Sequence, residues 1–167
     1  MPILDPYSFE CVSHGEEQTQ RLGYRLGALL PAHAIIALTG PLGAGKTQFA
    51  RGIGVGWGSL QPLRSPTFTV VAEHHRAKDA HILYHIDLYR MENAAALRSL
   101  GVEEILADEH SVCIIEWAER AGELIPPDAL RLKLELTSES KRLLTFSTKA
   151  TTTWQLLLAF RRSAFGV

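Results

Sequence analysis

Residues 40–47 (Gly-Pro-Leu-Gly-Ala-Gly-Lys-Thr) have the types and spacing of a phosphate-binding loop. The glycines let successive backbone N–H groups turn toward phosphate oxygens, in a conformation that a Cβ would obstruct. Lys46 supplies a mobile positive charge for the β- and γ-phosphates, and the Thr47 hydroxyl suits Mg²⁺. The loop therefore predicts binding of ATP with Mg²⁺. The expected contacts in this stretch are Gly40, Pro41, Leu42, Gly43, Ala44, Gly45, Lys46, Thr47 and Gln48.

The segments around this loop support the prediction. Residues 34–39 form a short apolar run that is typical of a buried parallel strand. Residues 48–51 can continue a helix, which Gly52 and Gly54 are expected to interrupt, so that 52–64 would be a loop. A strand, a glycine-rich loop and a helix in this order form the context that such a site needs.

Two acidic residues follow patterned strands. Glu116 comes after the apolar run 112–115, and Asp87 lies near the end of the strand expected at 81–89. Ligands bind at the carboxyl ends of parallel strands, and phosphoryl transfer needs a carboxylate near the metal and a group that orients the attacking water. A single acid of this kind is usually a solvated edge residue, but two beside an intact loop favour a role in the site.

A third feature is the segment 65–68, Ser-Pro-Thr-Phe. Pro66 stiffens a turn and places the Thr67 hydroxyl at the start of a strand. Such a threonine could sense the γ-phosphate and metal, as switch loops do. The alternative is an ordinary Ser-Pro turn.

Composition limits the classes of partner. The chain has 167 residues, enough for one domain, with 46% hydrophobic and 21% charged residues. Its 17 basic and 18 acidic residues give a net charge of −1, so there is no electrostatic excess for broad contact with nucleic acid. No apolar stretch approaches the ~20 residues that span a bilayer, and no signal peptide is recognisable. We expect a soluble cytoplasmic protein without membrane contact.

The expected architecture is α/β, with a mainly parallel sheet between helices and an antiparallel edge hairpin. A capping box of Ser13 and Glu16 should begin a helix that ends by Pro31. His85 is expected to be a neighbour of Asp87 rather than a metal ligand. Residues 1–150 would form the ATPase domain, and 151–167 a helical tail that docks on it or binds a partner. The other expected strands are 7–12, 67–73, 130–137 and 143–148, and the other helices are 92–100 and 102–107.

Four motifs together resemble the TsaE (YjeE) family of small bacterial P-loop ATPases, which are required to make threonylcarbamoyladenosine in tRNA. The resemblance covers about residues 10–140 and includes Leu22-Gly23 in the first helix. Three departures from the family pattern are Pro41, where the family usually has Asp, Ala118, where it usually has Pro, and Ser140-Lys141-Arg142, which replaces a Gly-Arg turn. The motifs are the loop at 40–47, Ser-Pro-Thr-Phe at 65–68, His-Ile-Asp-Leu-Tyr-Arg at 85–90 and Ile-Glu-Trp at 115–117.

This resemblance implies roles for individual residues. Lys46 and the loop amides would hold the phosphates, and Thr47 and Glu116 would hold Mg²⁺. Asp87 would assist the metal or the water, and Trp117 would respond to the nucleotide. The implied partners are TsaD and TsaB, with tRNA reached only through their complex.

Two other functions stay open from the sequence. A small-molecule kinase would use the same loop, but it usually needs an arginine-rich lid, and the candidate stretch 119–131 holds only Arg120 and Arg131. A nucleotide-gated binding protein would hydrolyse ATP only incidentally.

Overall fold

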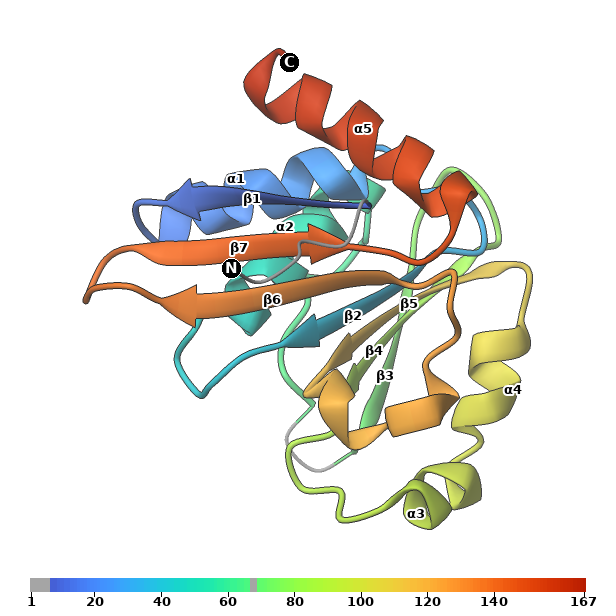
Figure 1. Ribbon diagram of the computed structural model, residues 1–167. Coiled ribbons are helices and arrows are strands. Elements are labelled where there is room, and N and C mark those ends of the chain that lie inside the picture. The colour runs from blue at the N-terminus through green and yellow to red at the C-terminus, as the bar shows by residue number, and fades with distance from the viewer. Residues whose placement is uncertain (1–6, 67–68) are drawn as a thin grey trace.

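The computed structural model describes residues 7–66 and 69–167 (Figure 1). One seven-stranded sheet runs through the molecule in the order β1-β7-β6-β2-β5-β4-β3. Its strands are β1 (Ser8–Ser13), β2 (Ile35–Thr39), β3 (Val71–His75), β4 (Ile82–Asp87), β5 (Ser111–Glu116), β6 (Leu130–Leu136) and β7 (Arg142–Ser147).

The centre of the sheet is parallel and both of its edges are antiparallel. Strand β2 pairs in parallel with β5 and β6, and β4 pairs in parallel with β5. The β6–β7 hairpin and β1 form one antiparallel edge, and β3 forms the other. Every residue of β5 is buried, as expected for a strand covered on both faces. The predicted α/β class with an antiparallel edge is confirmed.

Helices cover both faces of this sheet (Figure 1). On one face α1, α2 and α5 pack with the side chains of Ile36 and Leu38; on the other, α3, α4 and a short 3₁₀ turn pack with Ile35 and Ala37. The alternation of β2 side chains between two cores follows from the strand's period of two. The helices are α1 (Glu16–Gly27), α2 (Lys46–Trp57), α3 (Ala94–Ser99), α4 (Val102–Ala107) and α5 (Thr151–Phe165), with 3₁₀ turns η1 (Ala118–Arg120) and η2 (Gly122–Leu124).

Helix α2 continues through the glycines that were expected to end it, so the prediction of a loop from residue 52 was wrong. The reason is the close approach of α1. A Cβ on Gly52 would lie 2.1 Å from the carbonyl oxygen of Gln20, and one on Gly56 would lie 2.0 Å from that of Tyr24. The lost helix propensity of glycine is offset because the two backbones can pack against each other.

The start of α1 also differs from the prediction. The helix begins at Glu16, after Gly15, and no side chain caps it. Ser13 is the last residue of β1, and its Oγ bonds the Thr19 hydroxyl at 2.7 Å and the Gly15 carbonyl oxygen at 2.9 Å. The expected capping box fails because the Ser13 backbone stays paired in the sheet, opposite Arg142.

Helix α5 packs at the edge of the hydrophobic core that α1 and α2 form with the sheet. Leu157 and Phe160 are buried, and the Phe160 ring lies 5.0 Å from that of Phe146 and 6.2 Å from that of Phe9. Phe165, the last residue of α5, is exposed. Within the described residues, no helix has the length and apolar character needed to cross a membrane.

Candidate nucleotide-binding site

The phosphate-binding motif joins the end of β2 to the start of α2, at the carboxyl edge of the parallel strands. Gly40, Gly43 and Gly45 have φ angles of 140°, 81° and 105°, which residues with a Cβ rarely adopt. The loop itself therefore requires glycine at these positions. Gly40 also lies against β6, where a Cβ would come within 2.3 Å of the Leu134 carbonyl oxygen.

Within the described residues, the first turn of α2 has backbone N–H groups without a backbone acceptor. The first amide of the helix to reach an acceptor one turn back is that of Phe49, which bonds the Gly45 carbonyl oxygen at 2.9 Å. The preceding amides at the helix start have no intrahelical acceptor. Together with the positive end of the helix dipole, they form a site suited to phosphate oxygens.

Lys46 lies inside this loop and is only 5% exposed. Its Nζ donates to the carbonyl oxygens of Gly40 at 2.5 Å and Pro41 at 2.9 Å. Burial lowers the pKa of Lys46, and the nearby carboxylates of Glu116, Glu119 and Asp87 oppose that shift. The ammonium is therefore held by acceptors and negative charge, in a position facing the loop.

Thr47 and Glu116 meet across the sheet edge. The Thr47 hydroxyl donates to Glu116 Oε1 at 2.8 Å and lies 2.9 Å from the Ser65 hydroxyl. Glu116 is the last residue of β5 and is 2% exposed. A hydroxyl and a carboxylate at contact distance beside a phosphate-binding loop form a donor set of the kind that Mg²⁺ takes in nucleotide sites.

His85 bonds the other oxygen of the same carboxylate. Its Nε2 lies 2.6 Å from Glu116 Oε2, and the His85 side chain is fully buried. His85 was expected to be a packing or hydrogen-bonding neighbour of Asp87; it lies near enough to influence the Asp87 carboxylate, but its hydrogen bond goes to Glu116. Residues 85 and 87 lie on the same side of β4, and the imidazole of His85 reaches across to Glu116 at the end of the neighbouring strand β5.

Asp87 ends β4 directly beside Glu116, its register partner in the parallel pair. Its Oδ1 accepts the Tyr89 backbone N–H at 3.0 Å. Burial raises the pKa of Asp87, the nearby Glu116 adds to the rise, and the hydrogen bond from Tyr89 opposes it. Two carboxylates from adjacent strands thus face the same cleft.

Trp117 lies over Lys46. Its ring centroid is 4.0 Å from Lys46 Nζ, within the range of a cation–π contact. Its φ of 58° is the only positive value among the non-glycine residues described, a conformation that costs roughly 1–2 kcal/mol. This sharp turn directly after β5 directs the indole toward the loop. Tyr89 packs on it, with ring centroids 5.1 Å apart.

Arg142 was not among the residues predicted for the site. It is buried at the start of β7, and its Nε donates to the Ala44 carbonyl oxygen at 3.0 Å. The guanidinium also restricts Gly45, where a Cβ would come within 3.1 Å of Arg142 Nε. The sequence offered one weak signal for Arg142: it belongs to the segment Ser140-Lys141-Arg142, which replaces the family's Gly-Arg turn. Ser65, Tyr89 and Glu16 are further lining residues that the prediction did not include.

The side chains around the phosphate-binding loop enclose a cleft of about 260 Å³. Gly40, Pro41 and Ala44 contribute backbone to the loop but do not line the cleft, and Thr67 lies outside the described residues. Gln48 lines it and is held by Gln20, whose Nε2 donates to Gln48 Oε1 at 2.5 Å. The predicted residues that line it are Leu42, Gly43, Gly45, Lys46, Thr47, Gln48, Asp87, Glu116 and Trp117.

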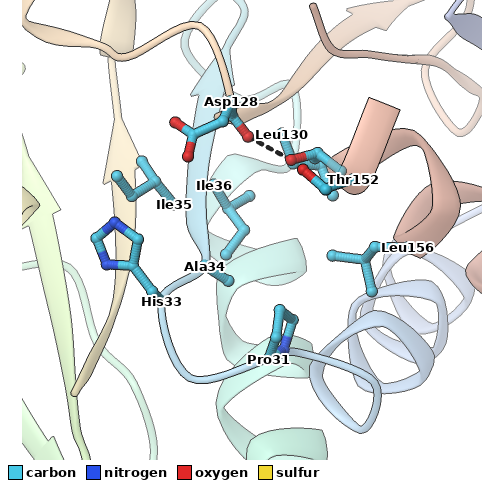
Figure 2. A pocket seen from close by; sticks show the side chains of 10 residues that line it. Pro31, His33, Ala34, Ile35, Ile36, Asp128, Leu130, Thr152 and Leu156 are labelled. Atoms are coloured by element: carbon cyan, nitrogen blue, oxygen red, sulfur yellow. Dashed lines mark hydrogen bonds between the residues drawn. The ribbon is translucent and has the colours of Figure 1, made fainter. Parts of the chain in front are cut away.

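A separate hollow lies at the amino ends of β2 and β6, at the opposite edge of the sheet (Figure 2). Its volume is about 140 Å³. Figure 2 shows Leu156 of α5 on one side and His33 on the other. The Asp128 carbonyl oxygen on its wall already accepts the Thr153 hydroxyl at 2.5 Å. This hollow has no arrangement of charged groups comparable with that of the cleft.

Comparison with protein families agrees with this geometry. The family profile described as "Threonylcarbamoyl adenosine biosynthesis protein TsaE" matches residues 13–144, a stretch that includes the loop, Asp87 and Glu116. The chain belongs to the TsaE family. Its members act in the biosynthesis of threonylcarbamoyladenosine in tRNA.

Individual relatives extend the match over most of the chain. The tRNA threonylcarbamoyladenosine biosynthesis protein TsaE of Treponema pallidum is 34% identical over 135 residues, which cover 81% of this chain and 97% of the relative. The TsaE protein of Bacillus subtilis is 33% identical and covers 78% of this chain and 80% of its own. The crystal structure of YdiB from Bacillus subtilis superposes with a TM-score of 0.75 at 26% identity, covering 93% of this TsaE-family chain and 95% of YdiB.

Proposed function

We propose that this TsaE-family protein binds and hydrolyses Mg-ATP, and that it does so to drive or reset a threonylcarbamoyladenosine synthase containing TsaD and TsaB. The observation that carries the proposal is the contact of Thr47 with Glu116 at 2.8 Å, beside a complete phosphate-binding loop. Family membership supports the pathway, and the cleft supports the chemistry. Action on tRNA through a protein complex is consistent with a net charge of −1.

The residues present fit ATP and Mg²⁺. The positive-φ glycines leave the loop backbone free to approach phosphate, and the amides at the start of α2 face it. Lys46 would hold the β- and γ-phosphates, and the Thr47 hydroxyl and Glu116 carboxylate would hold the metal. When bound, Mg²⁺ neutralises charge on the transferring phosphoryl group.

Asp87 is the second carboxylate of the proposed site. It faces the cleft beside Glu116, and burial raises its pKa, which favours a group that can accept and hold a proton. It would orient the attacking water or assist the metal. Trp117 covers Lys46 and would respond to nucleotide binding.

Hydrolysis by the isolated chain should be slow. Arg142 lines the cleft, but its Nε is engaged by Ala44, and Arg120 donates to the backbone carbonyls of Tyr89 and Met91. Both guanidinium groups are anchored to backbone carbonyl oxygens, which limits how far either can move toward the phosphoryl group. A group supplied by a partner is worth ~10³–10⁵ in rate, so partner stimulation follows from the site.

The deciding experiment compares ATP hydrolysis by the purified chain alone, with TsaB, with TsaD and with both. We expect slow turnover alone and strong stimulation by the pair, absent with Lys46→Ala. A chain that binds ATP but gains nothing from the partners would contradict the proposal and favour a nucleotide-gated binding protein.

The kinase alternative has less support. A phosphate-covering lid would need free arginines between residues 119 and 131. Arg120 is bound to backbone carbonyls, and Arg131 lies within β6. Phosphorylation of a small-molecule acceptor at a rate above that of ATP hydrolysis would nevertheless overturn the ATPase assignment.

A further inference from the structure

The Glu116 carboxylate is bound at both of its oxygens. Oε1 accepts the Thr47 hydroxyl at 2.8 Å, and Oε2 lies 2.6 Å from His85 Nε2. Glu116 is 2% exposed and His85 is 0% exposed, so the contact between them is shielded from water, whereas Thr47 is partly exposed at the cleft. The three side chains form one chain of hydrogen bonds that starts at the phosphate-binding loop and ends at the buried imidazole of His85.

His85 is well placed to fix the direction of this carboxylate. It lies within β4, whose parallel pairing with β5 sets His85 opposite Ile114, two residues before Glu116. A glutamate side chain has several rotatable bonds, whereas an imidazole in a paired strand is held by the sheet. Groups that hydrogen-bond a metal-ligating side chain orient it and raise the affinity of the site for metal.

The direction of the hydrogen bond follows from its surroundings. His85 Nδ1 is buried and has no hydrogen-bond partner within the described part of the chain. At 2.6 Å an N–H at Nε2 can donate to Glu116 Oε2, and the imidazole tautomer that carries its proton on Nε2 provides this donor.

We propose that His85 is a positioning residue for Glu116: its Nε2–H holds Oε2 and leaves Oε1 turned toward Thr47 and the metal. The inference rests on the proposed role of Glu116 as a Mg²⁺ ligand. His85 does not touch the nucleotide or the metal; it acts through the carboxylate. Its loss should weaken metal binding while leaving the loop's own contacts with nucleotide in place.

Three substitutions separate positioning from simple packing. His85→Leu fills the space without a donor. His85→Gln can place an amide N–H near the position of Nε2, and His85→Asn places it near that of Nδ1, out of reach of Glu116. His74→Leu is the matched control, because His74 is a half-buried imidazole on the adjacent strand β3 whose Nδ1 contacts Ser59 rather than Glu116.

The experiment measures ADP binding to the full chain by calorimetry, without Mg²⁺ and along a Mg²⁺ series. We expect His85→Leu and His85→Asn to need ~10–100-fold more Mg²⁺ for half-maximal tightening of ADP binding. Their metal-free ADP affinity should stay within about twofold of the unmodified chain. His85→Gln should recover most of the Mg²⁺ response, and His74→Leu should not change it.

Other results would overturn the inference. An unchanged Mg²⁺ requirement in folded His85→Leu would do so, as would a parallel loss of metal-free and Mg²⁺-dependent binding in all three His85 variants, which indicates packing alone. If His85→Leu does not fold, the test is the Mg²⁺ requirement of His85→Gln compared with that of His85→Asn. An equal requirement in these two variants would reject the positioning role of His85.

Glu116→Ala in the same titration separates this inference from the function on which it rests. A lost Mg²⁺ response in Glu116→Ala with a normal response in His85→Leu rejects only the role of His85. A normal Mg²⁺ response in Glu116→Ala rejects the metal role of Glu116, and the inference about His85 with it.

Discussion

Thr47 and Glu116 are 69 residues apart in sequence, yet the hydroxyl of one donates to the carboxylate of the other at 2.8 Å. The contact exists because β2 and β5 are parallel neighbours, with Leu38 paired to Glu116. The loop that follows β2 and the end of β5 therefore lie at the same edge of the sheet. This relationship joins a phosphate-binding element to a carboxylate that could hold a metal.

Lys46→Ala should abolish productive ATP binding and leave the fold intact. Contacts to a charged group contribute about 1.5–3 kcal/mol each, so we expect an affinity loss of roughly 100-fold or more by calorimetry. Lys78→Ala is the control, because Lys78 is exposed in the turn between β3 and β4. A folded Lys46→Ala protein with undiminished ATP affinity would contradict the assignment.

Glu116→Ala should weaken the Mg²⁺ dependence of nucleotide binding and turnover. The substitution removes a carboxylate that faces Thr47, and Mg²⁺ sites in proteins depend on such oxygen ligands. Glu109→Ala, an exposed acid in the turn before β5, should behave as the unmodified chain. A structure with Mg-nucleotide in which Glu116 is remote from the metal would remove it from this role.

Asp87→Ala and Thr67→Ala should each lose most of the stimulation by TsaB and TsaD while still binding ATP. Asp87 faces the cleft beside Glu116, and Thr67 belongs to the motif whose first residue, Ser65, contacts Thr47. The measurement is turnover with and without partners. Turnover of the isolated chain on the order of 10 s⁻¹ would refute the dependence on partners, and so would variants that respond to them normally.

Asp87→Asn should increase stability at neutral pH. Burial raises the pKa of Asp87 above 3.8 in the folded state, so the native state retains this proton to higher pH than the unfolded state does. The free energy of unfolding then falls as pH rises through the folded-state pKa. Asn removes that loss and can still accept the Tyr89 N–H.

The test for Asp87→Asn is urea unfolding over a pH series. Its advantage over the unmodified chain should be present at pH 7 and narrow as pH falls toward the unfolded-state value of about 3.8. A variant that is less stable than the unmodified chain at pH 7 would show that the ionised carboxylate makes a net stabilising contact.

Gly52→Ala should destabilise the protein by about 1–3 kcal/mol, because its Cβ would lie 2.1 Å from the Gln20 carbonyl oxygen and force α1 and α2 apart. Gly54→Ala is the comparison in the same helix. Its Cβ would meet Cδ1 of the buried Leu63 at 2.3 Å, so it crowds a side chain rather than the backbone of α1. Urea unfolding compares the two, and equal losses would argue against a backbone clash.

Much of the architecture was predictable because its causes are local. The apolar run that became β5 and the alternating residues that became the β6–β7 hairpin indicate strands by themselves. The positive-φ glycines of the loop are required by its own backbone. Helix α2 was predicted too short because the low helix propensity of Gly52 and Gly56 is offset by close packing against α1. No local pattern in the α2 sequence reveals that contact.

The sequence alone determined the loop at 40–47, most of the strands and the presence of acids at strand ends, since each depends on backbone preference or hydrophobic period within a few residues; the strand expected at 67–73 is an exception and is found at Val71–His75. Tertiary structure alone decided which groups form hydrogen bonds with each other. His85 bonds Glu116, and Arg142 bonds the Ala44 carbonyl oxygen. Those contacts depend on the order of strands in the sheet, which places β4, β5 and β7 around the loop. Strand order is a property of long-range packing, and for that reason the partner of each buried polar group became visible only in the folded chain.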